Sequence, residues 1–298
     1  MSQFHLRLPA TSANLGPGFD SLALALKLYL HIDAERSEQF DIEASGRDAE
    51  ICGATENNLL IETYTEVLAS HNRASVPLQV GVHNEIPLGM GCGSSAAVRL
   101  AAVALASHFG GLAWSRERIL AEAARREGHP DNAAACWLGG FVASAIEGDR
   151  VEAISIAAPR DWRAVIVLPD EPLTTPASRA VLPSAWPRPD VVANLQRVAL
   201  LTAAFATGNA DPMAVAMGDR LHQPFRSGVC PLLPRLLPLA GKGGIAGVAL
   251  SGAGPAVLLL VASESAAVYA RVLAASKVEG LGKVEFLTCQ IENEPVAF

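Results

Sequence analysis

The chain has 298 residues, of which 50% are hydrophobic and 18% are charged. This balance is typical of a globular protein and argues against an intrinsically disordered one. The formal net charge is -7 and the sequence contains no basic cluster, so nucleic acid is not expected as a partner.

The first half of the chain alternates expected strands with expected helices. Strands are expected at 3–9, 21–33, 76–83, 138–145 and 151–156. Helices are expected at 57–71, at about 94–109, and between Ser115 and Gly128. A short apolar helix is expected to follow Asn132.

The second half begins near residue 162. Its expected elements are a strand at 164–168, a long loop at 169–189, helices at 190–207 and 211–221, a strand pair around 252–255, a helix at 263–275 and a strand at 283–290. Pro212 at the first helical position favours the helix 211–221. A loop as long as 169–189 is usually functional or mobile. The pattern predicts an α+β fold with two domains, 1–160 and 161–298.

The longest uncharged run, 243–263, is long enough to span a membrane. Gly247, Gly252 and Pro255 interrupt it, which favours two buried strands joined by a tight turn. The N-terminus has no basic stretch before a long apolar core, and the five cysteines include no CxxC pair. These features predict a cytoplasmic protein with reduced thiols, no membrane partner and no structural zinc.

The strongest chemical signal is a glycine-rich segment before the helix 94–109. Its residues are Pro87, Leu88, Gly89, Met90, Gly91, Cys92, Gly93, Ser94, Ser95, Ala96 and Ala97. Glycines let the backbone come close to a ligand, and the free amides of a helix N-terminus attract phosphate. The first helical turn carries no Asp or Glu, which leaves room for an external anion. The segment therefore predicts a phosphate-binding loop, in which the Ser95 hydroxyl could face magnesium or a phosphate oxygen.

Three other interpretations of this segment have to be weighed. It could be an ordinary strand-to-helix turn with a serine cap. It is not a Walker loop, because no lysine follows Gly93. Gly91, Gly93 and Ala96 match the dinucleotide-binding pattern, but that unit needs a second strand after the helix, and here a further helix is expected.

Two acidic residues follow at the end of the next helix. Glu127 opposes the helix dipole there, which a bound cation would offset. The ordinary explanation is a surface carboxylate neutralised by Arg125 and Arg126. Asp131 could be a favourable charge in a first helical turn, or it could accept or orient a hydroxyl proton. On local evidence alone the ordinary explanation of Glu127 is favoured. Either carboxylate gains a functional interpretation only because the predicted phosphate loop lies nearby in sequence and a kinase needs acidic groups for magnesium.

Four separated segments carry a family resemblance. They are 9–20 (PATSANLGPGFD), 87–97 (PLGMGCGSSAA), 128–132 (GHPDN) and 247–257 (GVALSGAGPAV). Together they resemble the GHMP kinase superfamily and, within it, the homoserine kinases. The resemblance spans the whole chain. It implies an N-terminal domain like the second domain of ribosomal protein S5 and a ferredoxin-like C-terminal domain, with ATP and substrate meeting between them.

The resemblance also implies a reaction and a set of site residues. The reaction would convert L-homoserine and ATP to O-phospho-L-homoserine and ADP, in threonine biosynthesis. Ser95 and Glu127 would hold Mg²⁺. The implied catalytic residues are Glu127, Asp131, Asn132 and Arg179, and the implied substrate-binding residues are Asn14, Asp20, His129, Asn132, Thr175, Arg179 and Arg226.

The chemistry of these residues suits an amino acid substrate. Guanidinium groups bind a carboxylate through two parallel hydrogen bonds, which suits Arg179 and Arg226. Asp20 suits the ammonium. Without the resemblance, both arginines would be taken for solvated surface charges. Asp131 is expected to be secondary, because phosphoryl transfer depends more on alignment and charge neutralisation than on a base.

The sequence departs from the family pattern at three positions. Cys92 stands where the family usually has Leu, and Ala133 and Ala135 stand where it usually has Val and Pro. Changes in packing are expected from these small apolar residues. Cys92 is not expected to act as a nucleophile, because phosphoryl transfer needs no covalent step.

Alternative functions remain open at this point. The chain could be another GHMP kinase that acts on mevalonate, shikimate or a sugar. It could be a catalytically inactive nucleotide-binding regulator, although its intact Ser95, Glu127, Asp131 and Arg179 argue against that. A nicotinamide-dependent dehydrogenase is disfavoured by the expected order of helices. A homodimer is the expected assembly.

Overall fold

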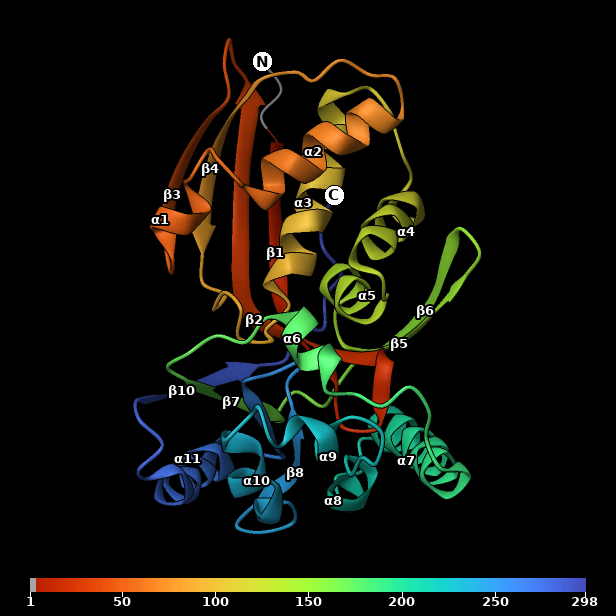
Figure 1. Ribbon diagram of the computed structural model, residues 1–298, viewed down its shortest axis with the longest axis vertical. Coiled ribbons are helices and arrows are strands. Elements are labelled where there is room, and N and C mark those ends of the chain that lie inside the picture. Colours follow the sequence, from red (N-terminus) through yellow and green to blue (C-terminus); the bar gives the residue numbers. More distant parts are fainter. Residues whose placement is uncertain (1–3) are drawn as a thin grey trace.

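The computed structural model describes residues 4–298 and contains two β-sheets, one in each half of the chain (Figure 1). The strands of the first sheet are β1 (Phe4–Asn14), β2 (Gly18–Arg36), β3 (Asp41–Gly46), β4 (Leu78–Asn84), β5 (Phe141–Glu147) and β6 (Arg150–Ile156). Their order is β3-β4-β2-β5-β6, and β1 also pairs with β2. Strand β2 organises this sheet, because it is 19 residues long and pairs with β4 near one end and β5 near the other.

Helices stack on one face of the first sheet (Figure 1). They are α1 (Ala49–Cys52), α2 (Leu59–Ser70), α3 (Ser94–Phe109), α4 (Arg116–Glu127) and α5 (Asp131–Leu138). Helix α3 is central, and its many buried alanines let α2, α4 and α5 pack close to it. Helix α4 starts at the Ser115 cap and ends at Gly128, whose φ of 84° is the left-handed conformation typical of a C-cap glycine.

The second sheet has the ferredoxin-like order of strands. Its strands are β7 (Arg163–Pro169), β8 (Ile245–Leu250), β9 (Val257–Val261) and β10 (Val284–Gln290), in the antiparallel order β10-β7-β9-β8. The helices of this half are α6 (Thr175–Ala180), α7 (Arg188–Thr207), α8 (Met213–Ala216), α9 (Gln223–Arg226), α10 (Leu232–Leu236), the 3₁₀ turn Leu237–Leu239 and α11 (Glu264–Val278). Helices between the first two strands and between the last two give the βαββαβ pattern.

The second sheet is buried on both faces. Val165 and Val167 of β7 belong to the core formed with α10 and α11. Ala164 and Ile166 point to the other face and belong to the large core that includes the first half. The alternation of side chains along a strand explains this division. It also explains why β7 is a continuous apolar run rather than an alternating one.

The chain returns to the first half after β10. The Glu292 amide donates to the Ala25 carbonyl (3.0 Å) and the Val296 amide donates to the Trp137 carbonyl (3.1 Å). The expected boundary at residue 160 falls between β6 and β7, but the last eight residues belong spatially to the N-terminal half. The division 1–160 and 161–298 therefore stays a prediction.

The structure differs from the expected elements at a few places. The expected loop 169–189 contains α6, whose start is capped by the Thr174 hydroxyl (3.4 Å to the Ala177 amide). Six residues are too few to show a helical period in the sequence. The expected helix 211–221 is only α8, Met213–Ala216, and β3 was not expected. The expected strand 3–9 lies within β1, although residue 3 is outside the described residues. Within residues 4–298, no helix has both the length and the apolar character needed to cross a membrane.

Candidate active site

A polar pocket of about 170 Å³ lies where the two halves meet, below α3 and beside α6. Ten residues expected to act on substrate or metal all line it. They are Asn14, Asp20, Ser95, Glu127, His129, Asp131, Asn132, Thr175, Arg179 and Arg226. These residues are distant in sequence, so the fold brings them together. Their individual roles stay predictions.

In the glycine-rich loop the backbone carbonyls accept hydrogen bonds from the protein, whereas the backbone amides of residues 89–95 are free in the part of the protein that the structure describes. Gly89, Gly91 and Gly93 have φ values of 68°, 81° and 74°, which residues with a Cβ rarely adopt. The loop carbonyls are occupied: Gly89 O accepts from Leu173 N (3.2 Å), Met90 O from Ala256 N (3.2 Å), Gly91 O from Ser251 Oγ (2.7 Å) and Cys92 O from Thr11 N (3.0 Å). In contrast, within the described chain the amides of residues 89–95 donate to no protein acceptor.

This arrangement suits an anion. Successive free amides and the N-terminus of α3 direct partial positive charge toward one place. Of the expected phosphate-loop residues, Gly89, Gly91, Gly93, Ser94 and Ser95 line the pocket. The other six expected residues do not line this pocket. They are Pro87, Leu88, Met90, Cys92, Ala96 and Ala97. One of them, Cys92, is buried, and burial raises the pKa of its thiol to about 12, which fits the expectation that it is not a nucleophile.

Gly91→Ala is expected to lower the free energy of unfolding and to distort this loop. A Cβ at Gly91 would lie 2.2 Å from the Ser251 carbonyl oxygen, which is backbone and cannot yield easily. We expect a loss of about 2–4 kcal/mol, from left-handed strain and overpacking together. Urea unfolding measures it. Gly148→Ala is the control: its φ is 59° but nothing lies within 4 Å of the new Cβ. Equal losses in the two variants would contradict the steric argument.

Glu127 faces the pocket and is not neutralised by its neighbours in sequence. Arg125 and Arg126 instead bind the buried Glu122, at 2.6 Å and 2.8 Å. The carboxylate of Glu127 accepts a hydrogen bond from Ser95 Oγ (3.0 Å) and forms an ion pair with Arg99, which also donates to Ser95 Oγ. The ordinary explanation of Glu127, a surface charge paired with Arg125 and Arg126, is therefore wrong.

Asp20 and Arg179 bind each other across the pocket. The Arg179 guanidinium donates two hydrogen bonds to the Asp20 carboxylate, at 2.6 Å and 3.1 Å. Both residues were expected to bind opposite ends of one substrate. Asn14 holds the Asp20 loop, since its Oδ1 accepts from the Asp20 amide (3.0 Å) and its Nδ2 donates to the Gly252 carbonyl (2.7 Å). The pair places a negative and a positive group side by side in the pocket, and each can bind the opposite charge of a small zwitterion once the ion pair opens.

His129 and Asp131 form a second charged pair in the pocket. Asp131 is buried, and its Oδ1 lies 2.7 Å from His129 Nδ1 and accepts from the Asn132 amide at 2.7 Å. Burial lowers the pKa of His129, but the hydrogen bond to Asp131 and nearby negative charges outweigh it, so the pKa is raised.

Ligand atoms of Asp20, His129 and Asp131 lie within 4.8 Å of one another. Such a group could in principle hold a metal ion. The carboxylates of Asp20 and Asp131 in this group also suit the ammonium of an amino acid substrate.

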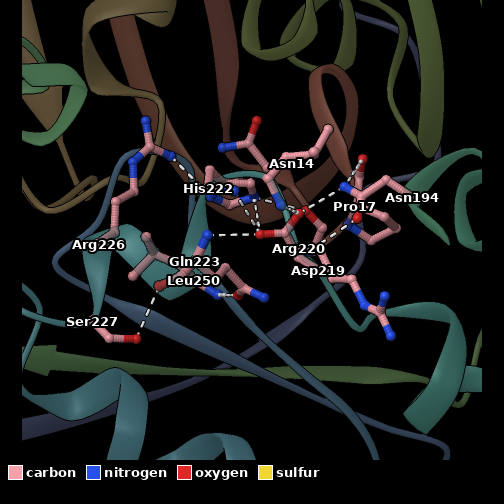
Figure 2. A network of polar contacts seen from close by, with 12 residues as sticks. Asn14, Pro17, Asn194, Asp219, Arg220, His222, Gln223, Arg226, Ser227 and Leu250 are labelled. Atoms are coloured by element: carbon pink, nitrogen blue, oxygen red, sulfur yellow. Dashed lines mark hydrogen bonds and ion pairs between the residues drawn. The ribbon is translucent and has the colours of Figure 1, made fainter. Parts of the chain in front are cut away.

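Arg226 is buried rather than solvated, with 1% of its surface exposed. It lies at the end of a polar network that joins the halves of the chain (Figure 2). Its guanidinium donates to Nδ1 of His222 (3.0 Å), and Nε2 of His222 lies 2.7 Å from the Gly16 carbonyl. Since Nδ1 accepts and Nε2 donates, His222 is neutral. Burial is the main cause that lowers its pKa, which agrees with this state.

The support of this network was not predicted from the sequence. Asp219 accepts four hydrogen bonds, from Asn194 Nδ2 (2.7 Å) and from the amides of Leu221 (2.9 Å), His222 (2.9 Å) and Gln223 (2.6 Å). This carboxylate ends the turn in which a continuous helix 211–221 was expected. Asp is common in turns, where its side chain accepts hydrogen bonds from nearby backbone amides, so Asp219 within the expected helix was a signal of this turn.

An apolar pocket of about 260 Å³ adjoins the phosphate loop. It lies between β2, β3, β4, α1 and the start of α2. It shares Ser94 and Ser95 with the polar pocket, so the two pockets adjoin at the start of α3. Most of its walls are aliphatic, including Ile32, Ile42 and Leu88. A flat apolar group would fit there while an attached anion lies on the loop.

Comparison with known proteins defines the class first. A family model described as the GHMP kinases N terminal domain matches residues 58–140. The solved structure of a homoserine kinase from Cytophaga hutchinsonii superposes with a TM-score of 0.84 at 23% identity, covering 100% of this chain and 97% of that one. The two-sheet architecture is therefore the GHMP kinase fold, as expected.

More similar sequences define the family within that class. A homoserine kinase of Solibacter usitatus is 48% identical over 261 residues, which are 87% of this chain and 85% of that protein. A putative homoserine kinase of Listeria monocytogenes, known as a solved structure, is 29% identical with a TM-score of 0.78, covering 99% and 98% of the two chains. The chain belongs to the homoserine kinase family, which confirms the resemblance drawn from its motifs.

Proposed function

We propose that the chain transfers the γ-phosphoryl group of ATP to the side-chain hydroxyl of L-homoserine, giving O-phospho-L-homoserine and ADP for threonine biosynthesis. This proposal depends on one observation: a phosphate-binding loop and a pair of opposite charges line the same pocket. The phosphate loop has free amides over residues 89–95. Next to it, the ion pair of Asp20 and Arg179 offers the two opposite charges that an amino acid substrate needs.

ATP would extend across the two adjoining pockets. The adenine would occupy the apolar pocket beside Leu88, and the phosphates would lie on the loop amides and the N-terminus of α3. The γ-phosphate would then point into the polar pocket toward Asp131. This placement follows from the chemistry of each wall.

Ser95 and Glu127 fit the magnesium ion that we propose for this reaction. Ser95 Oγ and Glu127 Oε2 are 3.0 Å apart. Neighbouring ligands of an octahedral Mg²⁺ with bonds of about 2.1 Å are separated by about 3.0 Å. When bound, the ion would neutralise charge on the phosphate oxygens.

Homoserine would enter by exchange with an existing ion pair. Its ammonium would replace the guanidinium at Asp20, and its carboxylate would replace Asp20 at Arg179, with the buried Arg226 beside it. His129, Asn132, Asn14 and Thr175 line the remaining wall. The hydroxyl oxygen would then bond to the γ-phosphorus as the bond from phosphorus to the β–γ bridging oxygen breaks. ADP is the leaving group, and the hydroxyl proton passes to solvent or to Asp131.

Asp131→Asn is expected to lower kcat by about 10- to 100-fold, which is less than a base essential to the reaction would require. Asn keeps the size of the side chain and an oxygen that can accept from His129 and the Asn132 amide. Steady-state ADP release measures kcat, and a thermal melt checks the fold. A loss beyond about a thousandfold with an unchanged melting temperature would show that Asp131 is a base after all.

A substrate screen tests the proposed function directly. Coupled ADP release is measured with L-homoserine, L-threonine, L-serine and mevalonate at equal concentrations. We expect the highest kcat/KM with L-homoserine. Activity only with a compound that lacks an amino acid end, such as mevalonate, would refute the substrate. Absence of ADP release with every alcohol would instead favour a nucleotide-binding regulator.

We also propose a cytoplasmic location and a homodimer. All five cysteines are free, which suits a reducing compartment.

The homodimer is proposed from an exposed apolar surface on α11. It consists of Val268, Tyr269 and Val272, with 65%, 56% and 65% of their surfaces exposed, and a second copy could cover it. Light scattering coupled to gel filtration tests the dimer.

A further inference from the structure

Arg99 lies beside the proposed magnesium site and has no assigned role. It belongs to the second turn of α3, four residues after Ser95, and its side chain points back toward the helix N-terminus as helical side chains do. Its Nη1 donates to both Ser95 Oγ and Glu127 Oε2. The side chain of Arg99 is 23% exposed and that of Glu127 is 12% exposed. A fixed positive charge therefore already neutralises the metal-binding carboxylate.

The guanidinium and a metal ion need the same two oxygen atoms. A cation bound to both Ser95 Oγ and Glu127 Oε2 would lie in the space that Nη1 of Arg99 occupies. Mg²⁺ requires lone pairs of both atoms at about 2.1 Å, and these lone pairs now accept hydrogen bonds from Arg99. Two positive charges at contact also repel each other. The two occupants are mutually exclusive.

We propose that Arg99 is a positioning residue that competes with Mg²⁺ for Ser95 and Glu127. This inference rests on the proposed magnesium site. In the free enzyme the guanidinium holds Glu127 at the pocket wall and keeps the carboxylate neutralised. The metal enters together with the nucleotide, whose phosphates supply the further negative charge that displaces Arg99. Mg²⁺ binding therefore costs the energy of breaking one ion pair, and the enzyme binds metal tightly only when ATP is present.

Nucleotide binding with and without metal tests this competition without any turnover. Isothermal titration calorimetry gives the Kd of ATP in excess EDTA and the Kd of ATP in excess Mg²⁺, both without homoserine. The Kd in EDTA divided by the Kd in Mg²⁺ reports the coupling between metal and nucleotide, and a larger ratio means stronger coupling. In Arg99→Met the ion pair no longer has to be broken, so the ratio should rise about tenfold, which corresponds to about 1.4 kcal/mol. Arg99→Lys keeps one charge but loses the planar fork, and a rise of about threefold is expected.

Two controls make the result specific. Arg125→Met removes an arginine of the neighbouring helix α4 that pairs with Glu122, away from the metal atoms, and should leave the ratio unchanged. Glu127→Gln removes the proposed metal ligand and should bring the ratio close to one in both the wild-type and the Arg99→Met background. Arg99→Lys provides the test if Arg99→Met does not fold.

An unchanged or lower ratio in the Arg99 variants would overturn the competition. A lower ratio would mean that Arg99 binds the phosphates of the metal-loaded complex instead. If wild-type protein binds ATP with the same Kd in EDTA and in Mg²⁺, the metal site itself is wrong and the inference fails with it. If wild-type protein does not bind ATP at all, the proposed function fails as well, so these failures can be told apart.

Discussion

Replacing Glu127 by Gln is expected to lower kcat/KM for L-homoserine by about a thousandfold, because a metal-ligand charge contributes several kcal/mol to phosphoryl transfer and each 1.36 kcal/mol is a factor of ten. The amide oxygen of Gln can still accept from Ser95, so the local structure should persist. The charge that would hold Mg²⁺ is lost. Steady-state ADP release at saturating Mg²⁺ measures the effect.

The matched control for this prediction is Glu66→Gln. Glu66 lies on α2, is 68% exposed and pairs with Arg126 of α4. It is also a helical glutamate paired with an arginine, but it lies outside the pocket, so kcat/KM should change less than twofold. A loss below tenfold for Glu127→Gln would contradict a metal role for this carboxylate. Similar melting temperatures for both variants would show that folding is not the cause of any difference.

Arg179→Met should raise the KM for L-homoserine by about a hundredfold, since removing one partner of a paired charge costs about 2–5 kcal/mol. The lower part of that range applies because the Arg179 side chain is 37% exposed. Methionine keeps the length and the apolar stem but cannot donate to a carboxylate. The KM for ATP should stay nearly unchanged, because Arg179 lies on α6 rather than on the phosphate loop.

Arg220→Met is the control for this second prediction. Arg220 pairs with Asp190 at 3.2 Å and is 49% exposed, so it is a comparable ion-paired arginine outside the pocket. Its replacement should leave both KM values unchanged. If Arg179→Met raised the KM for ATP as much as the KM for homoserine, Arg179 would be a nucleotide residue and not a substrate residue.

The sequence was informative where chemistry is local. The phosphate loop could be predicted because alternating glycines and an acid-free helix start are adjacent in the chain, and α3 and α4 have clear caps and periods. The ferredoxin-like half followed from the family resemblance rather than from periodicity. The strand β3 and the helix α6 are too short to give a signal that stands out from their neighbours.

Contacts between distant segments could not be predicted. Arg99 is separated from Glu127 by 28 positions, and nothing in the sequence shows that α3 and α4 bring them together. Arg226 looks like a surface charge in the sequence, yet Asp219 and His222 hold it inside the protein. In each case the decisive factor is a tertiary hydrogen bond, and local patterns carry no information about such bonds.

The hydrogen bonds that hold the phosphate loop also restrict how the two halves can move. Leu173, Ser251 and Ala256 of the C-terminal half hold three of its carbonyls, whereas Thr11 and α3 of the N-terminal half hold its other end. A hinge motion that separated the halves would have to break the hydrogen bonds between the loop and one of the halves. It would thereby disrupt the proposed nucleotide-binding loop. The phosphate loop is therefore tied to both halves of the chain, and its geometry depends on their staying in contact.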